Sequence, residues 1–154
     1  MEQSTVNAKQ KRSIPPLFQQ LPLILLWIIL HFVFPIRMIL EFPFTLIGLA
    51  PIIVGLFMQV QAARILLKNK GVGEKPTLLV TDGPYKYSRN PAYLGGIVFF
   101  FGFAILLGSL VSFVFPLIMF LLAHFLYIPI EEKELKVIFG EKYLDYMKHV
   151  RRWI

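Results

Sequence analysis

The longest uncharged run in the sequence constrains the fold more than any other feature. It covers residues 90–130, 41 residues without an Asp, Glu, Lys or Arg, and shorter runs cover residues 13–36 and 42–63. A helix needs about 20 apolar residues to cross the hydrocarbon core of a bilayer. The longest run is therefore long enough for two spans, and we expect it to reverse within residues 108–112.

The composition is that of a membrane protein. Of the 154 residues, 56% are hydrophobic and only 16% are charged, which separates the chain from soluble domains. We expect an all-α integral membrane fold with about four transmembrane helices and a C-terminal amphipathic helix at the interface. Cysteine is absent and the three histidines are scattered, so disulfides, thiolate chemistry and a metal site are excluded from the expectation.

The basic residues predict the orientation. All but Arg37 of the 16 lysines and arginines lie in the N-terminal tail, in residues 64–89 or after residue 130. Four spans place these segments on one face, which the positive-inside rule makes cytoplasmic. The net charge of +7 is then a topology signal, and no nucleic-acid partner is expected, because no stripe of basic and aromatic residues accompanies it. A signal peptide is not expected either, since the first uncharged run has the length of a span.

These patterns divide the chain into three parts. Residues 1–13 are expected to be a disordered polar tail, and residues 14–67 to form two N-terminal transmembrane helices. Within the second of these helices, Gly48 and Gly55 are candidate points of close helix packing. Residues 68–154 are expected to form the functional core.

The core is expected to contain a loop, a hairpin and a final helix. The loop is rich in Gly and Pro, the helical hairpin covers residues 91–130, and the C-terminal helix covers residues 131–152 with a bend at Gly140. This last helix has one apolar face and one charged face, which is typical of a helix lying at a membrane surface. Residues 151–153 are then expected to anchor at the level of the headgroups.

Two polar clusters flank the hairpin, one before it and one after it. Two spans joined by a short turn return to the same surface, so we expect the clusters to lie about one helix-packing distance apart. The first cluster contains Tyr85, Tyr87, Arg89, Asn90 and Tyr93, and the second contains Glu131, Glu132 and Glu134.

A purely structural explanation of these residues stays open. Asn90 and Pro91 suit the N-cap and first position of a helix, and Tyr93 suits an interfacial aromatic belt. Glu131 and Glu132 suit the N-terminal turn of a solvated helix. Taken jointly, the two clusters favour a binding site over this explanation.

The order of the motifs resembles a known family. Residues 79–95 follow the pattern L-V-T-x-G-P-Y-x-x-S-R-N-P-x-Y-L-G, and after the hairpin come E-E-x-x-L, F-G-x-x-Y-x-x-Y and V-R-R-W. Over about residues 77–154 this set resembles the isoprenylcysteine carboxyl methyltransferase and phospholipid methyltransferase group of integral-membrane enzymes. The resemblance implies an S-adenosylmethionine pocket at the cytoplasmic membrane surface, with a lipid-side opening for a lipid, prenylated or other membrane-delivered acceptor.

The resemblance also implies which residues form the site. Lys70 is a weaker candidate, because no motif anchors the loop before Thr77. From the residue types, we assign for catalysis Arg89 as an orienting cation that pairs with the Glu131–Glu132 pair, with snorkelling to the headgroups as the alternative. Glu132 is assigned as its partner, and His124 as a candidate general base. The cofactor contacts carried over by motif are Thr77, Leu78, Leu79, Val80, Tyr85, Asn90, Pro91, Ala92, Tyr93 and Glu131.

The residue types suit this cofactor on chemical grounds alone. Tyrosine rings can cover an adenine and a sulfonium, and Glu131 or Glu132 can accept a hydrogen bond from an ammonium or a ribose. Backbone amides at the start of the helix after Asn90 offer a site for a carboxylate. Methyl transfer is an in-line displacement that needs no metal and no protein nucleophile.

Two positions depart from the isoprenylcysteine enzymes. Asn90 stands where those enzymes have histidine, and an amide cannot act as a titratable base. Tyr127 stands four residues before Glu131, where they place an arginine that contacts the acceptor carboxylate. Both departures concern the acceptor rather than the cofactor. For His124, inside an apolar span, a packing role is the alternative to that of a base.

Two other functions remain as alternatives. Membrane sterol reductases have a similar C-terminal hairpin and would bind NADPH, although Asn90, the Glu131–Glu132 pair and the short chain argue against them. In a non-catalytic membrane scaffold, the clustered residues would be dispensable for any ligand binding. Binding of adenosyl compounds or of NADPH separates these three functions.

Overall fold

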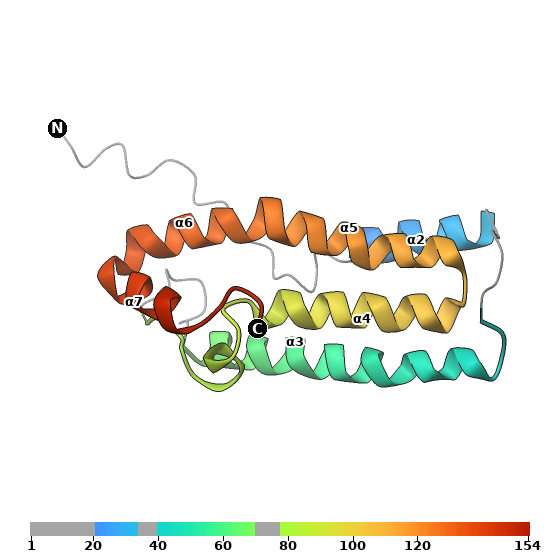
Figure 1. Ribbon diagram of the computed structural model, residues 1–154, viewed down its shortest axis with the longest axis horizontal. Coiled ribbons are helices and arrows are strands. Elements are labelled where there is room, and N and C mark those ends of the chain that lie inside the picture. The colour runs from blue at the N-terminus through green and yellow to red at the C-terminus, as the bar shows by residue number, and fades with distance from the viewer. Residues whose placement is uncertain (1–20, 34–39, 70–77) are drawn as a thin grey trace.

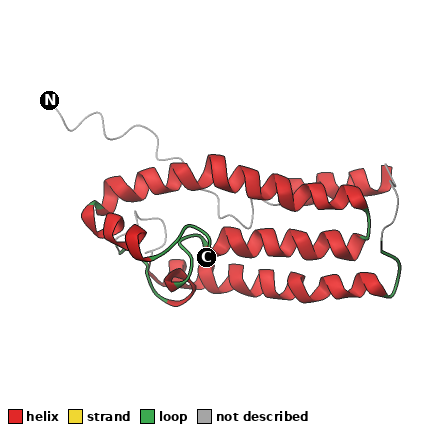
Figure 2. Ribbon diagram, in the orientation of Figure 1, coloured by secondary structure: helices red, strands yellow, loops and turns green. Residues whose placement is uncertain are grey.

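The structure is a computed structural model that describes residues 21–33, 40–69 and 78–154. Every regular element in these ranges is a helix, as expected for an all-α fold (Figures 1 and 2). The expected polar tail, Lys70 and Thr77 lie outside the described residues. In chain order the elements are α2 (Leu21–Val33), η1 (Phe44–Gly48), α3 (Leu49–Asn69), η2 (Gly83–Lys86), α4 (Pro91–Leu107), η3 (Leu110–Phe113), α5 (Val114–Leu122), η4 (Ala123–Tyr127), α6 (Ile128–Phe139) and α7 (Glu141–His149).

Helices α3 and α4 lie side by side along the molecule (Figure 1). Glycines allow their backbones to touch: a Cβ atom built on Gly55 would lie 2.5 Å from the Gly95 carbonyl oxygen, and one on Gly48 would lie 2.4 Å from that of Gly102. Small residues at such crossings are typical of helix pairs in membranes, where van der Waals contact replaces hydrophobic burial. The close packing expected at Gly48 and Gly55 is confirmed.

We expect the substitution Gly55→Ala to destabilise the protein by about 1 to 3 kcal/mol, because the added methyl group forces two backbones apart. Thermal unfolding in detergent micelles measures this loss. Ile53→Ala is the matched control, since Ile53 is 65% exposed on the same helix and its truncation should change the melting temperature little. Equal melting of Gly55→Ala and the unchanged chain would contradict the close contact.

The hairpin turns at Gly108, within the stretch where the uncharged run is expected to reverse. Gly108 adopts φ 66°, and its amide donates to the carbonyl oxygens of Ala104 and Ile105. This left-handed position after the last helical residue suits glycine. The hydroxyl groups of Ser109 and Ser112 then bond to each other at 2.7 Å, which satisfies two buried polar groups in the turn.

Helix α2 packs on the hairpin through an aromatic cluster. Trp27 is buried and stacks on Phe115 with a centroid distance of 4.6 Å and on Phe100 at 5.6 Å. Phe103 meets the same indole ring edge-on at 5.3 Å. Such pairs add to the stabilisation that burial of the rings gives.

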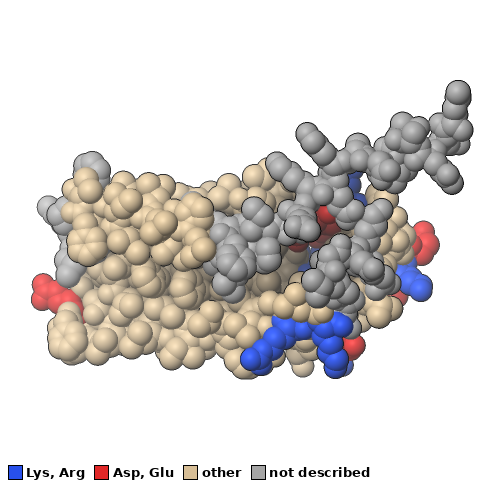
Figure 3. All heavy atoms as spheres, turned by 180° about the vertical axis from the view of Figure 1, so that it is seen from behind, with Lys and Arg blue, Asp and Glu red and all other residues tan. Residues whose placement is uncertain are grey.

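Length and composition mark two candidate membrane-spanning segments among the described residues. They cover Phe44–Lys68 and Leu110–Phe139, while α4 is apolar but shorter. Helix α2 is the described part of a longer uncharged run, so the count of four spans stays a prediction. On the face drawn in Figure 3, the Lys and Arg side chains lie in the half that carries α6 and α7, and the other half shows none among the described residues.

The C-terminal part differs from the expectation in two ways. The helix expected to begin at Glu131 is continuous with the hairpin, because α5, the π-helical η4 and α6 form one unbroken helix. It breaks at Gly140, where φ is 51°, and α7 folds back and ends at His149 rather than at residue 152. Residues 150–154 are not helical, and two of them, Arg152 and Trp153, contact Glu132 and His124. The expected anchoring at headgroup level stays a prediction.

Candidate functional site

The two polar clusters meet where α4 begins and α6 begins. The Tyr93 hydroxyl, at the third residue of α4, donates to Glu131 Oε1 at 2.7 Å. The hairpin brings residues 38 positions apart into contact, as its two antiparallel arms require. Tyr127 lies with its ring parallel to that of Tyr93, 6.2 Å away between centroids. These residues form a wall with one carboxylate and two stacked phenol rings.

Tyr85 completes this wall from the loop before α4. It is buried, and its carbonyl oxygen accepts a 2.6 Å hydrogen bond from the hydroxyl of Tyr146 in α7. Burial raises the pKa of the Tyr85 phenol, and the charge of Glu131 and the neighbouring Tyr146 raise it further. Burial likewise raises the pKa of Tyr146, to about 12. Both phenols are therefore protonated near neutral pH, and the Tyr146 hydroxyl serves as a donor.

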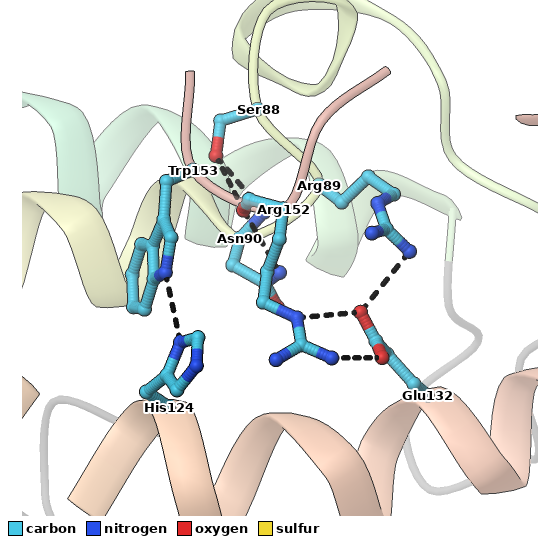
Figure 4. A network of polar contacts seen from close by, with 7 residues as sticks. All are labelled: Ser88, Arg89, Asn90, His124, Glu132, Arg152 and Trp153. Carbon is cyan, nitrogen blue, oxygen red and sulfur yellow. Dashed lines mark hydrogen bonds and ion pairs between the residues drawn. The ribbon is translucent and has the colours of Figure 1, made fainter. Parts of the chain in front are cut away.

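Arg89, Glu132 and Arg152 form an ion cluster next to the wall (Figure 4). Arg152 binds Glu132 with two parallel bonds, Nη2 to Oε2 at 2.7 Å and Nε to Oε1 at 3.1 Å. Arg89 Nη1 lies 3.0 Å from Glu132 Oε1. The Glu132 and Arg89 side chains are 8% and 9% exposed, and that of Arg152 is 28% exposed. The expected pairing of Arg89 with the acidic pair thus occurs at Glu132.

The ion cluster carries an excess of positive charge. Two guanidinium groups share one carboxylate, and the Nε of Arg89 makes no hydrogen bond to any described residue. Tyr143 is buried beside them. Its pKa is raised by burial and by Glu132, while Arg89 and Arg152 act in the opposite direction. The region is therefore suited to an anionic group, whereas Glu131 is suited to a cationic or hydroxyl group.

Asn90 occupies the N-cap position of α4 but does not cap it. Its side chain makes no capping hydrogen bond; instead Nδ2 donates to the Arg152 carbonyl oxygen at 3.1 Å. Its backbone N–H donates to Ser88 Oγ at 3.1 Å. The structural explanation of Asn90 as a side-chain cap is therefore wrong, while Pro91 does occupy the first turn.

His124 lies in the π-helical segment and contacts Trp153. Its Nδ1 lies 3.2 Å from the indole Nε1 of Trp153, which can only donate. The imidazole also stacks on Phe120 with a centroid distance of 5.5 Å. When His124 is neutral, acceptance at Nδ1 places its proton on Nε2. These contacts favour the packing role, and the role of base stays a prediction.

The structure gives less evidence on the remaining candidate cofactor contacts. Leu78 is 63% exposed, Leu79 and Val80 are half-buried, and Pro91 and Ala92 form the first turn of α4. Because their contribution would come from backbone atoms or van der Waals contact, their place in a cofactor site stays a prediction.

Sequence reasoning missed the residues that close the site from the C-terminal side. Most of these residues lie in the motifs F-G-x-x-Y-x-x-Y and V-R-R-W. Their amphipathic pattern was interpreted as a helix lying at a membrane surface, so no role in the site was expected. The missed residues of these motifs are Tyr143, Tyr146, Arg152 and Trp153, and Ser88, in the loop before α4, was missed as well.

Comparisons with known proteins identify relatives of the chain. A family model described as phospholipid methyltransferase matches residues 43–142. The protein-S-isoprenylcysteine O-methyltransferase of Schizosaccharomyces pombe is 40% identical over 77 residues. The solved structure of a eukaryotic intramembrane Ras methyltransferase, an isoprenylcysteine carboxyl methyltransferase, matches with a TM-score of 0.65 and 25% identity over 90% of this chain.

The chain is shorter than both of these relatives. The match covers 49% of this chain and 32% of the yeast protein, and the structural match covers 51% of the solved chain. What is shared is thus a part of each relative. The family model's match includes α4, α5 and α6.

Proposed function

The chain belongs to the phospholipid methyltransferase family, and on that premise we propose that it is an integral-membrane methyltransferase that uses S-adenosylmethionine. The observation that carries the proposal is the meeting of Tyr93 with Glu131 beside the buried ion cluster. An acidic and an aromatic wall next to a basic cluster matches the mixed charge of an adenosyl amino acid.

The residues of this site fit the parts of the cofactor. Bound S-adenosylmethionine supplies a methyl group on a positively charged sulfur. Glu131 would accept from its ammonium group or ribose, and the rings of Tyr85 and Tyr93 would face its adenine or its sulfonium. The backbone amides of the first turn of α4 would hold its carboxylate, favoured by the excess positive charge of Arg89 and Arg152.

The contribution of the protein to catalysis is positioning. Holding two reactants in line at near-attack distance removes much of the entropic barrier, and no protein nucleophile is needed. Arg89 and Glu132 would orient the loop before α4 and helix α6 rather than touch the reacting atoms, because each is occupied by its partner. His124 is retained as the candidate base, and its contact with Trp153 is the observation against it.

The acceptor is proposed to be a lipid, a prenylated molecule or another membrane-delivered compound. The site lies where apolar helices meet the charged end of the molecule, so a hydrophobic acceptor can approach from the bilayer. By the positive-inside rule this end, the loop before α4 and both termini are proposed to face the cytoplasm.

Calorimetric titration of the detergent-purified protein tests the proposal. We expect S-adenosylmethionine and S-adenosylhomocysteine to bind with Kd values of about 1 to 100 µM, a range usual for metabolite sites, and NADPH not to bind. Binding of NADPH alone would favour the reductase alternative. Failure of a folded sample to bind any of the three would favour the scaffold.

A further inference from the structure

Residues 150–154 cross the site without forming a helix, and we call them the C-terminal strap. The strap contacts both halves of the site (Figure 4). On one side the carbonyl oxygen of Arg151 accepts from the Arg89 backbone N–H at 3.0 Å. The carbonyl oxygen of Arg152 accepts from Ser88 Oγ at 3.3 Å and from Asn90 Nδ2 at 3.1 Å. The loop before α4 is therefore bonded to the strap at three successive residues.

On its other side the strap contacts the long helix that contains η4 and α6. The Arg152 guanidinium binds both carboxylate oxygens of Glu132, and the Trp153 indole donates to His124 while its ring packs on Phe120 at 5.4 Å. The two contact points on the helix, positions 124 and 132, are eight residues apart, about 12 Å along its axis. Two contacts at that spacing fix both the position and the rotation of the helix relative to the loop.

The charges around Glu132 distinguish its contact with Arg152 from an ordinary ion pair. Arg89 already neutralises Glu132, so the second cation is not needed for charge compensation. A second guanidinium next to the first is repulsive, and a two-point bond limits the orientation of Glu132 as a single contact would not. The two-point bond therefore adds orientation to the charge compensation that Arg89 already gives, which is the pattern of a positioning group.

We propose that Arg152 and Trp153 are positioning residues of the cofactor site, acting through Glu132, Asn90 and His124. The inference rests on the proposed function. The strap holds the loop that carries Tyr85 against the helix that carries Glu131, so these two parts of the wall keep one separation. Arg152 and Trp153 need not touch the cofactor themselves.

The test compares matched variants of the full chain by calorimetry with S-adenosylhomocysteine and by thermal unfolding in the same detergent. Arg152→Gln should raise Kd about tenfold, because small misplacements of a binding wall are costly, and Arg152→Lys should recover part of the loss by restoring the charge. Trp153→Phe, which keeps the ring but removes the indole donor, should raise Kd by about threefold, as expected for loss of one modest hydrogen bond.

Two controls separate positioning from general destabilisation. Lys148→Gln removes a positive charge from an exposed site on α7 and should leave Kd unchanged. Phe115→Leu disturbs the buried aromatic cluster about 24 Å along the long helix from Glu131; it should lower the melting temperature and leave Kd of the folded protein unchanged.

The outcomes are distinct. Weakened binding in Arg152→Gln with only partial recovery in Arg152→Lys supports the inference, because lysine restores the charge without the two-point bond. Full recovery in Arg152→Lys would show that charge alone matters and overturns it. Unchanged Kd in Arg152→Gln overturns it, and so does a rise in Kd that Phe115→Leu reproduces at an equal loss of melting temperature. If the unchanged, folded chain itself fails to bind S-adenosylhomocysteine, the proposed function fails, and the inference fails with it.

Discussion

Replacing Glu132 with alanine is expected to destabilise the protein by about 3 to 5 kcal/mol, the cost of leaving a buried charge without its partner. Glu132 is the only carboxylate that ion-pairs with Arg89 and Arg152 among the described residues. Its loss leaves two neighbouring guanidinium groups, one of them 9% exposed, with no counterion in the ion cluster. Thermal or denaturant unfolding in detergent micelles measures the change.

An exposed glutamate on the same helix provides the control for this prediction. Glu134→Ala removes the same charge two residues further along α6, where the side chain is exposed, and should change stability by no more than about 0.5 kcal/mol. Arg152→Gln should destabilise less than Glu132→Ala, because it leaves the pair of Arg89 and Glu132 intact. If Glu132→Ala unfolds like Glu134→Ala, the buried ion cluster does not contribute to stability.

The membrane fold was predictable because it depends on patterns that are local in sequence. Uncharged runs of span length indicated α3 and the hairpin, Gly108 marked the turn, and Gly55 marked a close helix contact. The family expected from the motif order is confirmed by the match over residues 43–142. Periodicity failed after Glu131, since a helix that leaves the membrane keeps the same apolar and charged faces as one that begins at its surface.

The site was predictable only where two short motifs flank one hairpin. Tyr93 and Glu131 meet because the hairpin arms are antiparallel, a consequence that topology alone imposes. The contacts of Arg152 and Trp153 depend on how a short non-helical segment turns after His149, and no periodic signal describes such a path. Arg152 and Trp153 are also typical of headgroup anchors, so composition gave no reason to expect these contacts.

Glu131→Ala is expected to weaken the binding of S-adenosylhomocysteine by about 1.5 to 3 kcal/mol, the usual loss for a hydrogen bond to a charged group. This is about a 10- to 150-fold rise in Kd, because each 1.4 kcal/mol is a factor of ten. Stability should fall much less, since Glu131 is half-buried and outside the ion cluster. The loss of stability should thus be much smaller at Glu131 than at Glu132, although the two carboxylates are neighbours in sequence.

That contrast makes the Glu131 experiment decisive for the assignment of the cofactor wall. Tyr93→Phe removes the 2.7 Å hydrogen bond to Glu131 but keeps the ring, so it should weaken binding less than Glu131→Ala. Glu134→Ala, with the same lost charge at an exposed position, should bind as the unchanged chain does. An unaltered Kd in Glu131→Ala would remove Glu131 from the cofactor site while leaving the fold and the family intact, because neither depends on which carboxylate contacts the ligand.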